Sequence, residues 1–167
     1  MKIALIVLFL ANAVAWNASY LFPAQYRPDR SFERGGKPYD AQALQAFVQK
    51  DEAAARRYAF PVLFPYDLLC MMLLGAFLAL ASVTWSAQVP WLAHLAWLFV
   101  LAPALYLAVD LAEDSLLAYL LTHGEAIGPA LVGPLQLLTK LKIVSFVAGV
   151  GQTAVLGLLA LIYARPF

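Results

Sequence analysis

The sequence predicts an all-α integral membrane protein, a bundle of four transmembrane helices with an amphipathic interfacial helix in the first loop. Hydrophobic residues make up 63% of the 167 residues and charged residues only 13%, and the mean hydropathy is +0.77. These values lie outside the range of soluble domains. The length suits a single membrane domain over residues 1–167. A net charge of +1 gives no basis for nucleic-acid binding.

The first predicted helix covers residues 3–22, which is about the twenty residues that a bilayer requires. Its start resembles a secretory signal peptide, with Ala13-Val14-Ala15 as a cleavage site, but we expect an uncleaved membrane helix. Asn17 lies near the end of this helix. Its amide could reach the acidic residues of the third helix; in the alternative interpretation, the polar residues of the first helix only pack inward.

Residues 23–38 are polar and rich in Pro, Gly and Arg, a composition typical of a loop. Asp40 is then the expected N-cap of a helix over residues 41–59. Apolar residues recur in this helix with helical spacing, and polar residues occupy the other face. The pattern predicts an amphipathic helix at the membrane surface, with its charges in solvent.

The second and third predicted helices form a hairpin over residues 66–85 and 91–123. The connection between them is short and uncharged. Trp85 and Trp91 flank it, like the aromatic belt at a membrane interface. The hairpin should therefore turn at one surface of the bilayer.

The fourth predicted helix covers residues 135–164 and follows an irregular segment, residues 124–134, that contains two Gly-Pro pairs. Small residues spaced by four run along this helix and allow another helix to approach closely. We call them the small-residue stripe: Ser145, Gly149, Thr153 and Gly157. The stripe is a candidate contact for a protein partner or for a second copy of the chain.

Four carboxylates and one lysine are predicted to lie at one depth in the membrane. Asp110, Glu113 and Asp114 share one helix face, because they are spaced by three and four residues. Asp67 and Asp110 each lie about 27 to 29 Å from the hairpin along their helices, roughly one hydrocarbon thickness. Lys142 lies at a matching distance from the end of the fourth helix. We call these five residues the polar layer.

Two interpretations of the polar layer remain open. In the structural one, Lys142 pairs with acids and the layer fixes the register of the helices. In the functional one, the acids bind a cation or the polar head of an amphiphile, or one carboxyl group moves a proton. Four acids face one lysine, and this excess of negative charge is costly beside lipid, which favours a functional role.

The sequence carries no recognisable catalytic or metal-binding motif. No His-x-x-Glu, His-Glu-x-x-His or second acidic helix motif accompanies the acids, so we expect no metal site and no cofactor. Neither a serine nor the single cysteine, Cys70, stands beside a base at a spacing typical of a nucleophile. His94 and His123 are expected near helix ends. Catalytic residues therefore remain unassigned.

Three short motifs carry a resemblance: Phe64-Pro65-Tyr66-Asp67-Leu68-Leu69, Asp110-Leu111-Ala112-Glu113-Asp114 and Leu141-Lys142. Over about residues 39–160 the chain resembles an uncharacterised family of small bacterial four-helix inner-membrane proteins. Those relatives usually carry Asn in place of Asp114, so this chain has one more negative charge. The resemblance implies a multi-pass protein of the cell inner membrane. In layout alone the chain is also similar to the emopamil-binding-protein and sigma-2 receptor group, whose bundle acids face a lipid-like ligand, but its residues do not match that group's catalytic pattern.

These observations predict a non-catalytic membrane protein built around the polar layer, either an accessory subunit or a binder of a lipid-like small molecule. Membrane lipids are expected partners, and nucleic acid is not. The alternative is a small intramembrane enzyme that acts on a lipid, isoprenoid or sterol-like substrate by carboxylate acid/base chemistry. The positive-inside rule favours a cytoplasmic polar layer, whereas Lys2 and the signal-like start favour the opposite orientation.

Overall fold

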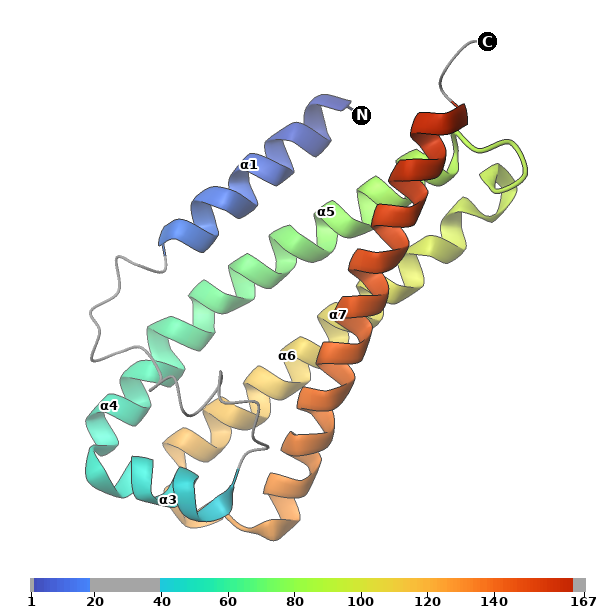
Figure 1. Ribbon diagram of the computed structural model, residues 1–167. Helices are drawn as coiled ribbons and strands as arrows, with labels where there is room; N and C mark the ends of the chain where they lie inside the picture. Colours follow the sequence, from blue (N-terminus) through green and yellow to red (C-terminus); the bar gives the residue numbers. More distant parts are fainter. Residues whose placement is uncertain (1, 19–39, 164–167) are drawn as a thin grey trace.

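The computed structural model describes residues 2–18 and 40–163, and every secondary-structure element within these ranges is a helix (Figure 1). Three helical segments are long and apolar enough to cross a membrane: Glu52–Ser86, Ala93–Thr122 and Pro129–Tyr163. This length and composition identify a helical membrane protein. The all-α and membrane predictions are confirmed at this level.

The long helices pack together as an antiparallel bundle (Figure 1). Helix α5 (Leu68–Ser86) leads through a short connection into η4 (Ala93–Val100), a 3-10 helix that continues directly into α6 (Leu101–Thr122). A short 3-10 helix, η5 (Gly124–Ala126), links α6 to α7 (Pro129–Tyr163). Because the connections are short, each helix returns beside the previous one.

The predicted start of the last helix at residue 135 is wrong, because α7 begins at Pro129. A proline in the first turn of a helix loses no hydrogen bond, since the first N–H groups have no partner in the helix. Pro134 then lies inside α7, which membrane helices tolerate. The third predicted helix also differs, because its first part is the 3-10 helix η4 rather than α-helix.

Helix α1 (Lys2–Ala18) packs antiparallel against α5 (Figure 1). The rings of Phe9 and Phe77 are in contact, with their centroids 6.0 Å apart. The Tyr66 hydroxyl donates a hydrogen bond to the carbonyl of Ala15. The helix has 17 described residues, and residues 19–22 of the predicted first span lie outside the described ranges.

The predicted single helix over residues 41–59 is wrong, because the chain forms two helices there. They are α3 (Ala41–Lys50) and α4 (Glu52–Arg57), and they meet at Asp51, which has an extended backbone. The Asp51 carboxylate accepts a hydrogen bond of 2.9 Å from a backbone N–H in the first turn of α4. An N-cap of this kind starts a new helix. Asp40 caps α3 in the same way, as predicted.

The segment η3 (Tyr58–Asp67) connects α4 to α5 and bends twice. The backbone is extended rather than helical at Phe60 and Phe64. Each of them precedes a proline, Pro61 or Pro65, and a proline ring disfavours a helical conformation of the residue before it. These bends turn the chain from α4 into α5.

Helices α3 and α4 and the segment η3 cover one end of the bundle (Figure 1). We call them, with the adjoining ends of α6 and α7, the cap. Leu44 of α3 and Ala55 of α4 are fully buried, as are Leu121 of α6 and Leu135 of α7. The cap core consists of Leu44, Val48, Ala55, Tyr58, Ala59, Leu63, Leu117, Ala118, Leu120, Leu121, Ile127, Val132 and Leu135. The apolar face of α3 therefore packs on protein.

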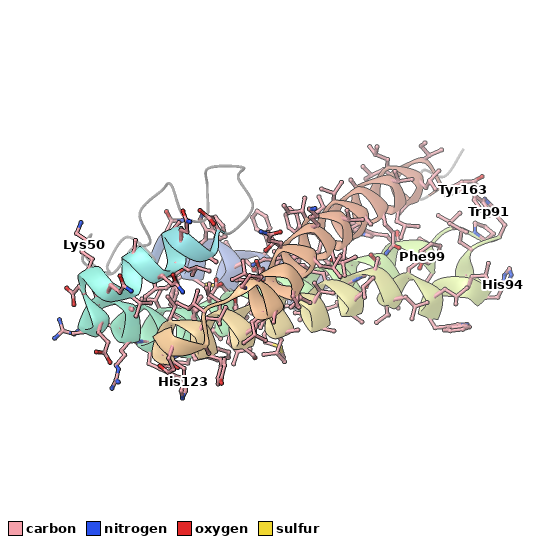
Figure 2. The ribbon with its side chains drawn as sticks, turned by 90° about the horizontal axis from the view of Figure 1, so that it is seen from below. Lys50, Trp91, His94, Phe99, His123 and Tyr163 are labelled. Atoms are coloured by element: carbon pink, nitrogen blue, oxygen red, sulfur yellow. The ribbon has the colours of Figure 1, made fainter. Side chains whose placement is uncertain are left out.

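The end of the bundle opposite the cap carries aromatic residues. Trp91 Nε1 donates a hydrogen bond of 3.3 Å to the Tyr163 hydroxyl. Figure 2 shows these two residues and His94 at one end of the molecule, and Lys50 and His123 at the other. The last helix thus ends beside the α5–η4 hairpin, as the spacing of the aromatic residues predicted.

The small-residue stripe packs within the chain. The hydroxyls of Thr153 and Ser82 are 2.9 Å apart, and Gly149 is buried against the start of α6. Gly157 faces the ring of Trp85. A contact with another protein through the stripe stays a prediction, and it would have to displace these contacts.

A glutamine side chain joins α7 to the start of α6. Pro103 has no N–H to donate to the carbonyl of Phe99, four residues earlier. Gln152 Nε2 donates to that carbonyl at 2.7 Å and to Ser82 Oγ at 3.1 Å. The amide therefore satisfies a backbone acceptor that the proline leaves open.

Candidate functional site

Helix α6 carries three carboxylates on its inward face. Asp110 is 2% exposed, and Glu113 and Asp114 are each 3% exposed. They share this face with the buried residues Tyr106 and Leu117, as the spacing of three and four residues requires. Burial of a carboxylate costs several kcal/mol unless a partner compensates its charge. The neighbouring helices supply part of that compensation.

Lys142 of α7 pairs with two of these carboxylates. Its ammonium lies 2.9 Å from Glu113 Oε2 and also contacts Asp110 Oδ1. Thr139 Oγ1 donates a hydrogen bond of 2.6 Å to the other oxygen of Glu113. The Lys142 side chain is 30% exposed, whereas the two carboxylate side chains are 3% exposed. The ion pairs are therefore open to the surface only on the side of the lysine.

Asp67 reaches the polar layer from the start of α5. Its carboxyl group lies close enough to interact electrostatically with Asp114, and also with Lys142, Asp110 and Glu113. Among the described residues, no donor bonds to Asp114 Oδ2. Two carboxylates can only accept hydrogen bonds, so contact between them requires a proton or a cation. We call Asp67 and Asp114 the carboxyl pair. Lys142 acts on both of them electrostatically, but its direct contacts are with Asp110 and Glu113.

The structure brings together all five residues of the predicted polar layer, from the end of η3 and from α6 and α7. The predicted contribution of Asn17 is wrong. Its side chain is exposed, and its amide donates a hydrogen bond of 2.7 Å to the carbonyl of Ala13. An asparagine on an exposed helix face commonly satisfies its amide on the preceding turn of its own helix.

The two histidines lie at helix ends, as predicted, and away from the polar layer. His94 is exposed in η4. His123 follows the last turn of α6, and its ring stacks on Tyr119 with a centroid distance of 4.6 Å. Cys70 of α5 is partly exposed.

The chemistry of the layer follows from its charges. Oxygen atoms of Asp110, Glu113 and Asp114 lie within 4.8 Å of one another, a spacing at which carboxylates can share one hard cation. Lys142 already supplies a positive charge to two of them, and the expectation of no metal site stays a prediction. The layer can bind a cation, accept hydrogen bonds from an ammonium or hydroxyl group, or exchange a proton within the carboxyl pair.

A pocket of about 350 Å³ lies between η3 and α6, and we call it the groove. Phe60 and Phe64 form one wall. The other wall is formed by Ser115, Ala118, Tyr119 and Thr122. The groove could not be predicted from the sequence, because its walls come from segments distant in the chain and depend on the bends of η3. The one available signal was the spacing of four between the two phenylalanines before Asp67.

The polar layer and the groove meet on α6, where Asp114 and Ser115 are neighbours in sequence but lie on the inner and outer faces. The residues that line the groove do not include any member of the polar layer, so the two are neighbouring but separate features of α6. No family model matches the chain, and no curated protein or solved structure matches it either.

Proposed function

We propose that the protein spans the cell inner membrane four times and binds a lipid-like molecule through its polar layer, without catalysing a reaction. In this arrangement α1 forms most of the first span, which is predicted to reach residue 22. The spans of α5, α6 and α7 complete the bundle. The cap, with α3 and α4 in the first loop, then lies at the membrane interface.

The main support for this proposal is that the polar layer contains four carboxyl groups and one lysine. One ammonium group, that of Lys142, contacts Asp110 and Glu113 and is also the cation that acts on Asp67 and Asp114, so one positive charge serves four carboxyl groups. A layer that served only to fix helix register would be more stable with fewer charges. Functional residues, in contrast, are commonly kept at a cost in stability. A ligand with a polar head would supply the missing hydrogen-bond donors.

The depth and surroundings of the layer support a ligand from the membrane. Asp67 lies about 28 Å from the end of α5, at 1.5 Å per residue, so the layer lies where the hydrocarbon core meets the head groups. Lys142, the exposed member of the layer, has the apolar neighbours Leu141, Ile143 and Val144. These three side chains are 44 to 66% exposed. The open side of the layer thus faces lipid.

We place the cap and the polar layer on the cytoplasmic side. Lys50, Arg56 and Arg57 lie in the cap, whereas Lys2 begins α1 at the opposite end of the bundle (Figure 1). Cytoplasmic segments of membrane proteins carry the excess of lysine and arginine. A reporter fused after Phe167 that is active only in the cytoplasm would contradict this orientation.

Mass spectrometry of gently purified protein tests the binding function. We expect the wild type to retain an amphiphile and the Asp67→Asn/Asp114→Asn variant to lose it, with a melting temperature equal to or above that of the wild type. Glu52→Gln, which changes an exposed carboxylate of α4, is the control and should retain the ligand. Equal retention by the double variant and the wild type would contradict the proposal. A stoichiometric protein partner without lipid would instead favour an accessory subunit.

The carboxyl pair favours one second candidate, an enzyme that uses carboxylate acid/base chemistry. Two carboxyl groups in contact share a proton, so one can act as an acid while the other acts as a base. Such an enzyme would convert a lipid, isoprenoid or sterol-like substrate in proteoliposomes. A product formed by the wild type and not by Asp67→Asn would support this candidate over the binder.

A further inference from the structure

Three carboxylates of α6, those of Asp110, Glu113 and Asp114, are buried together without enough partners. These residues are 2 to 3% exposed, and one oxygen from each lies within 4.8 Å of the others. Two of the carboxylates contact the Lys142 ammonium. Asp114 Oδ2 is buried and accepts no hydrogen bond from the described residues. We call the three residues the acidic triad.

The open oxygen of Asp114 indicates that the acidic triad lacks a positive partner. A buried acceptor without a donor costs about 1 to 3 kcal/mol, and more when the acceptor is charged. Lys142 is the one cation that contacts the triad among the described residues, and its ammonium already serves Asp110 and Glu113. A proton or a second cation would therefore complete the triad.

The Lys142 side chain can move away from the acidic triad without unfolding a helix. It is 30% exposed, whereas the two carboxylate side chains that it contacts are 3% exposed. A lysine has a flexible four-carbon stem, and near a membrane interface its ammonium can extend toward the head groups. A free cation can therefore replace the ammonium on Asp110 and Glu113 and bind Asp114 as well.

We propose that the acidic triad is a calcium site, and that the Lys142 ammonium occupies it when calcium is absent. Calcium binds oxygen at about 2.3 to 2.6 Å, so two opposite ligands lie about 4.6 to 5.2 Å apart. The separation of up to 4.8 Å among the triad oxygens fits this range, whereas opposite ligands of magnesium lie only about 4.2 Å apart. Three carboxylates offer up to about six oxygens, which is the smallest number that calcium takes.

The sequence alone predicts no metal site, because it shows neither the open oxygen of Asp114 nor the contact of one ammonium with two acids. In the fold, a divalent cation compensates more of the negative charge of the triad than the single charge of Lys142 does. Calcium binding goes beyond the proposed lipid binding and does not depend on it.

Thermal melts of EDTA-treated protein in detergent, titrated with calcium chloride or magnesium chloride at constant ionic strength, test the calcium site. Calcium should stabilise Lys142→Met with an apparent affinity at least about tenfold tighter than in the wild type, because the competing ammonium is gone. Magnesium should bind this variant at least about tenfold more weakly than calcium does. Lys140→Met, which removes an exposed lysine of α7, is the matched control and should respond like the wild type.

Adding Asp114→Asn to Lys142→Met should abolish the response to calcium. Adding Glu52→Gln, which changes an exposed carboxylate of α4, should leave the response intact. The inference would be overturned by the absence of a calcium response in Lys142→Met, by an equal response after Asp114→Asn is added, or by equal responses to calcium and magnesium. Lipid retention is measured separately, so these results would leave the proposed lipid binding standing.

Terbium(III) luminescence covers the case in which Lys142→Met does not fold. Terbium replaces calcium at oxygen sites, and a nearby tyrosine sensitises its emission. Tyr106 lies one turn before Asp110 on the same buried face of α6. The wild type should bind terbium, and Asp114→Asn should lower the emission at least about tenfold. Emission that is absent in the wild type, or unchanged in Asp114→Asn, would overturn the inference.

Discussion

The Lys142 ammonium lies 2.9 Å from the Glu113 carboxylate across the contact between α7 and α6. It also contacts Asp110, so one side chain compensates two buried charges. Lys142→Met should lower the free energy of unfolding by about 3 to 5 kcal/mol, because it leaves both carboxylates buried and uncompensated. Adding Asp110→Asn and Glu113→Gln to that variant should restore stability. Thermal melts in detergent measure both effects.

Lys140→Met is the control for this series. Lys140 is exposed on α7 and makes no ion pair among the described residues, so its loss should leave the melting temperature unchanged. Equal melting temperatures for Lys142→Met and the wild type would show that the layer does not contribute to the stability of the bundle.

The stability contributed by the hydrogen bond from Gln152 to the Phe99 carbonyl should depend on Pro103. Gln152→Leu should destabilise the protein by about 1 kcal/mol, because it leaves a partly buried backbone acceptor without this donor. Pro103→Ala restores an N–H to that carbonyl, so the same glutamine substitution should cost less in the alanine background. A double-mutant cycle of melting temperatures measures the coupling, and additive effects would refute it.

Gly75 of α5 should tolerate a side chain less well than Gly149 of α7. A Cβ at Gly75 would lie 2.5 Å from carbons of Leu107, whereas a Cβ at Gly149 would lie 3.7 Å from Leu78, at an ordinary contact distance. Gly75→Ala should therefore destabilise the bundle by about 1 to 3 kcal/mol through overpacking. Gly149→Ala should change stability little. The reverse order of melting temperatures would contradict the described packing of α5 on α6.

The local stability of the cap should depend on Leu44, which is fully buried in the cap core. Leu44→Ala should cost about 2 to 5 kcal/mol of local stability, because it removes buried methyl groups and leaves a cavity. We expect proteolysis in detergent to cut the α3–α4 region sooner in this variant, with the far end of the bundle unaffected. Lys50→Ala, at an exposed position of α3, should be cut at the wild-type rate.

The common level of the polar layer along the bundle could be predicted because the rise per residue of a helix is fixed. Counting from Trp85 and Trp91 brought Asp67 and Asp110 to one level, and counting back from the end of the last helix brought Lys142 to the same level. The tightest helix contact could not be predicted in the same way. Gly75 is the only glycine of the apolar helix α5. Only the position of Leu107 on the neighbouring helix shows that a side chain would not fit there.

The sequence pattern also led to wrong predictions at two positions where a side chain bonds to a nearby backbone group. Asp51 lies within an apolar periodicity that continues through it, yet its side chain caps a new helix and ends the previous one. Asn17 carries the same amide that could have crossed to another helix, and it bonds to Ala13 instead. Side chains that can bond to a nearby backbone group do so unless tertiary packing prevents it.

The cap core joins residues 44–63 to residues 117–135, and this pairing sets the order in which the chain can assemble. During synthesis α3 and α4 emerge long before the start of α7. Their apolar faces can be buried in the cap core only after residues 117–135 have been made. Contacts of such sequence separation form late, and an exposed apolar surface is prone to aggregation in the meantime. In the arrangement proposed above, with the cap at the membrane interface, the bilayer surface would cover the apolar face of α3 during that interval, and the helix would exchange this lipid contact for a protein contact once α7 is in place.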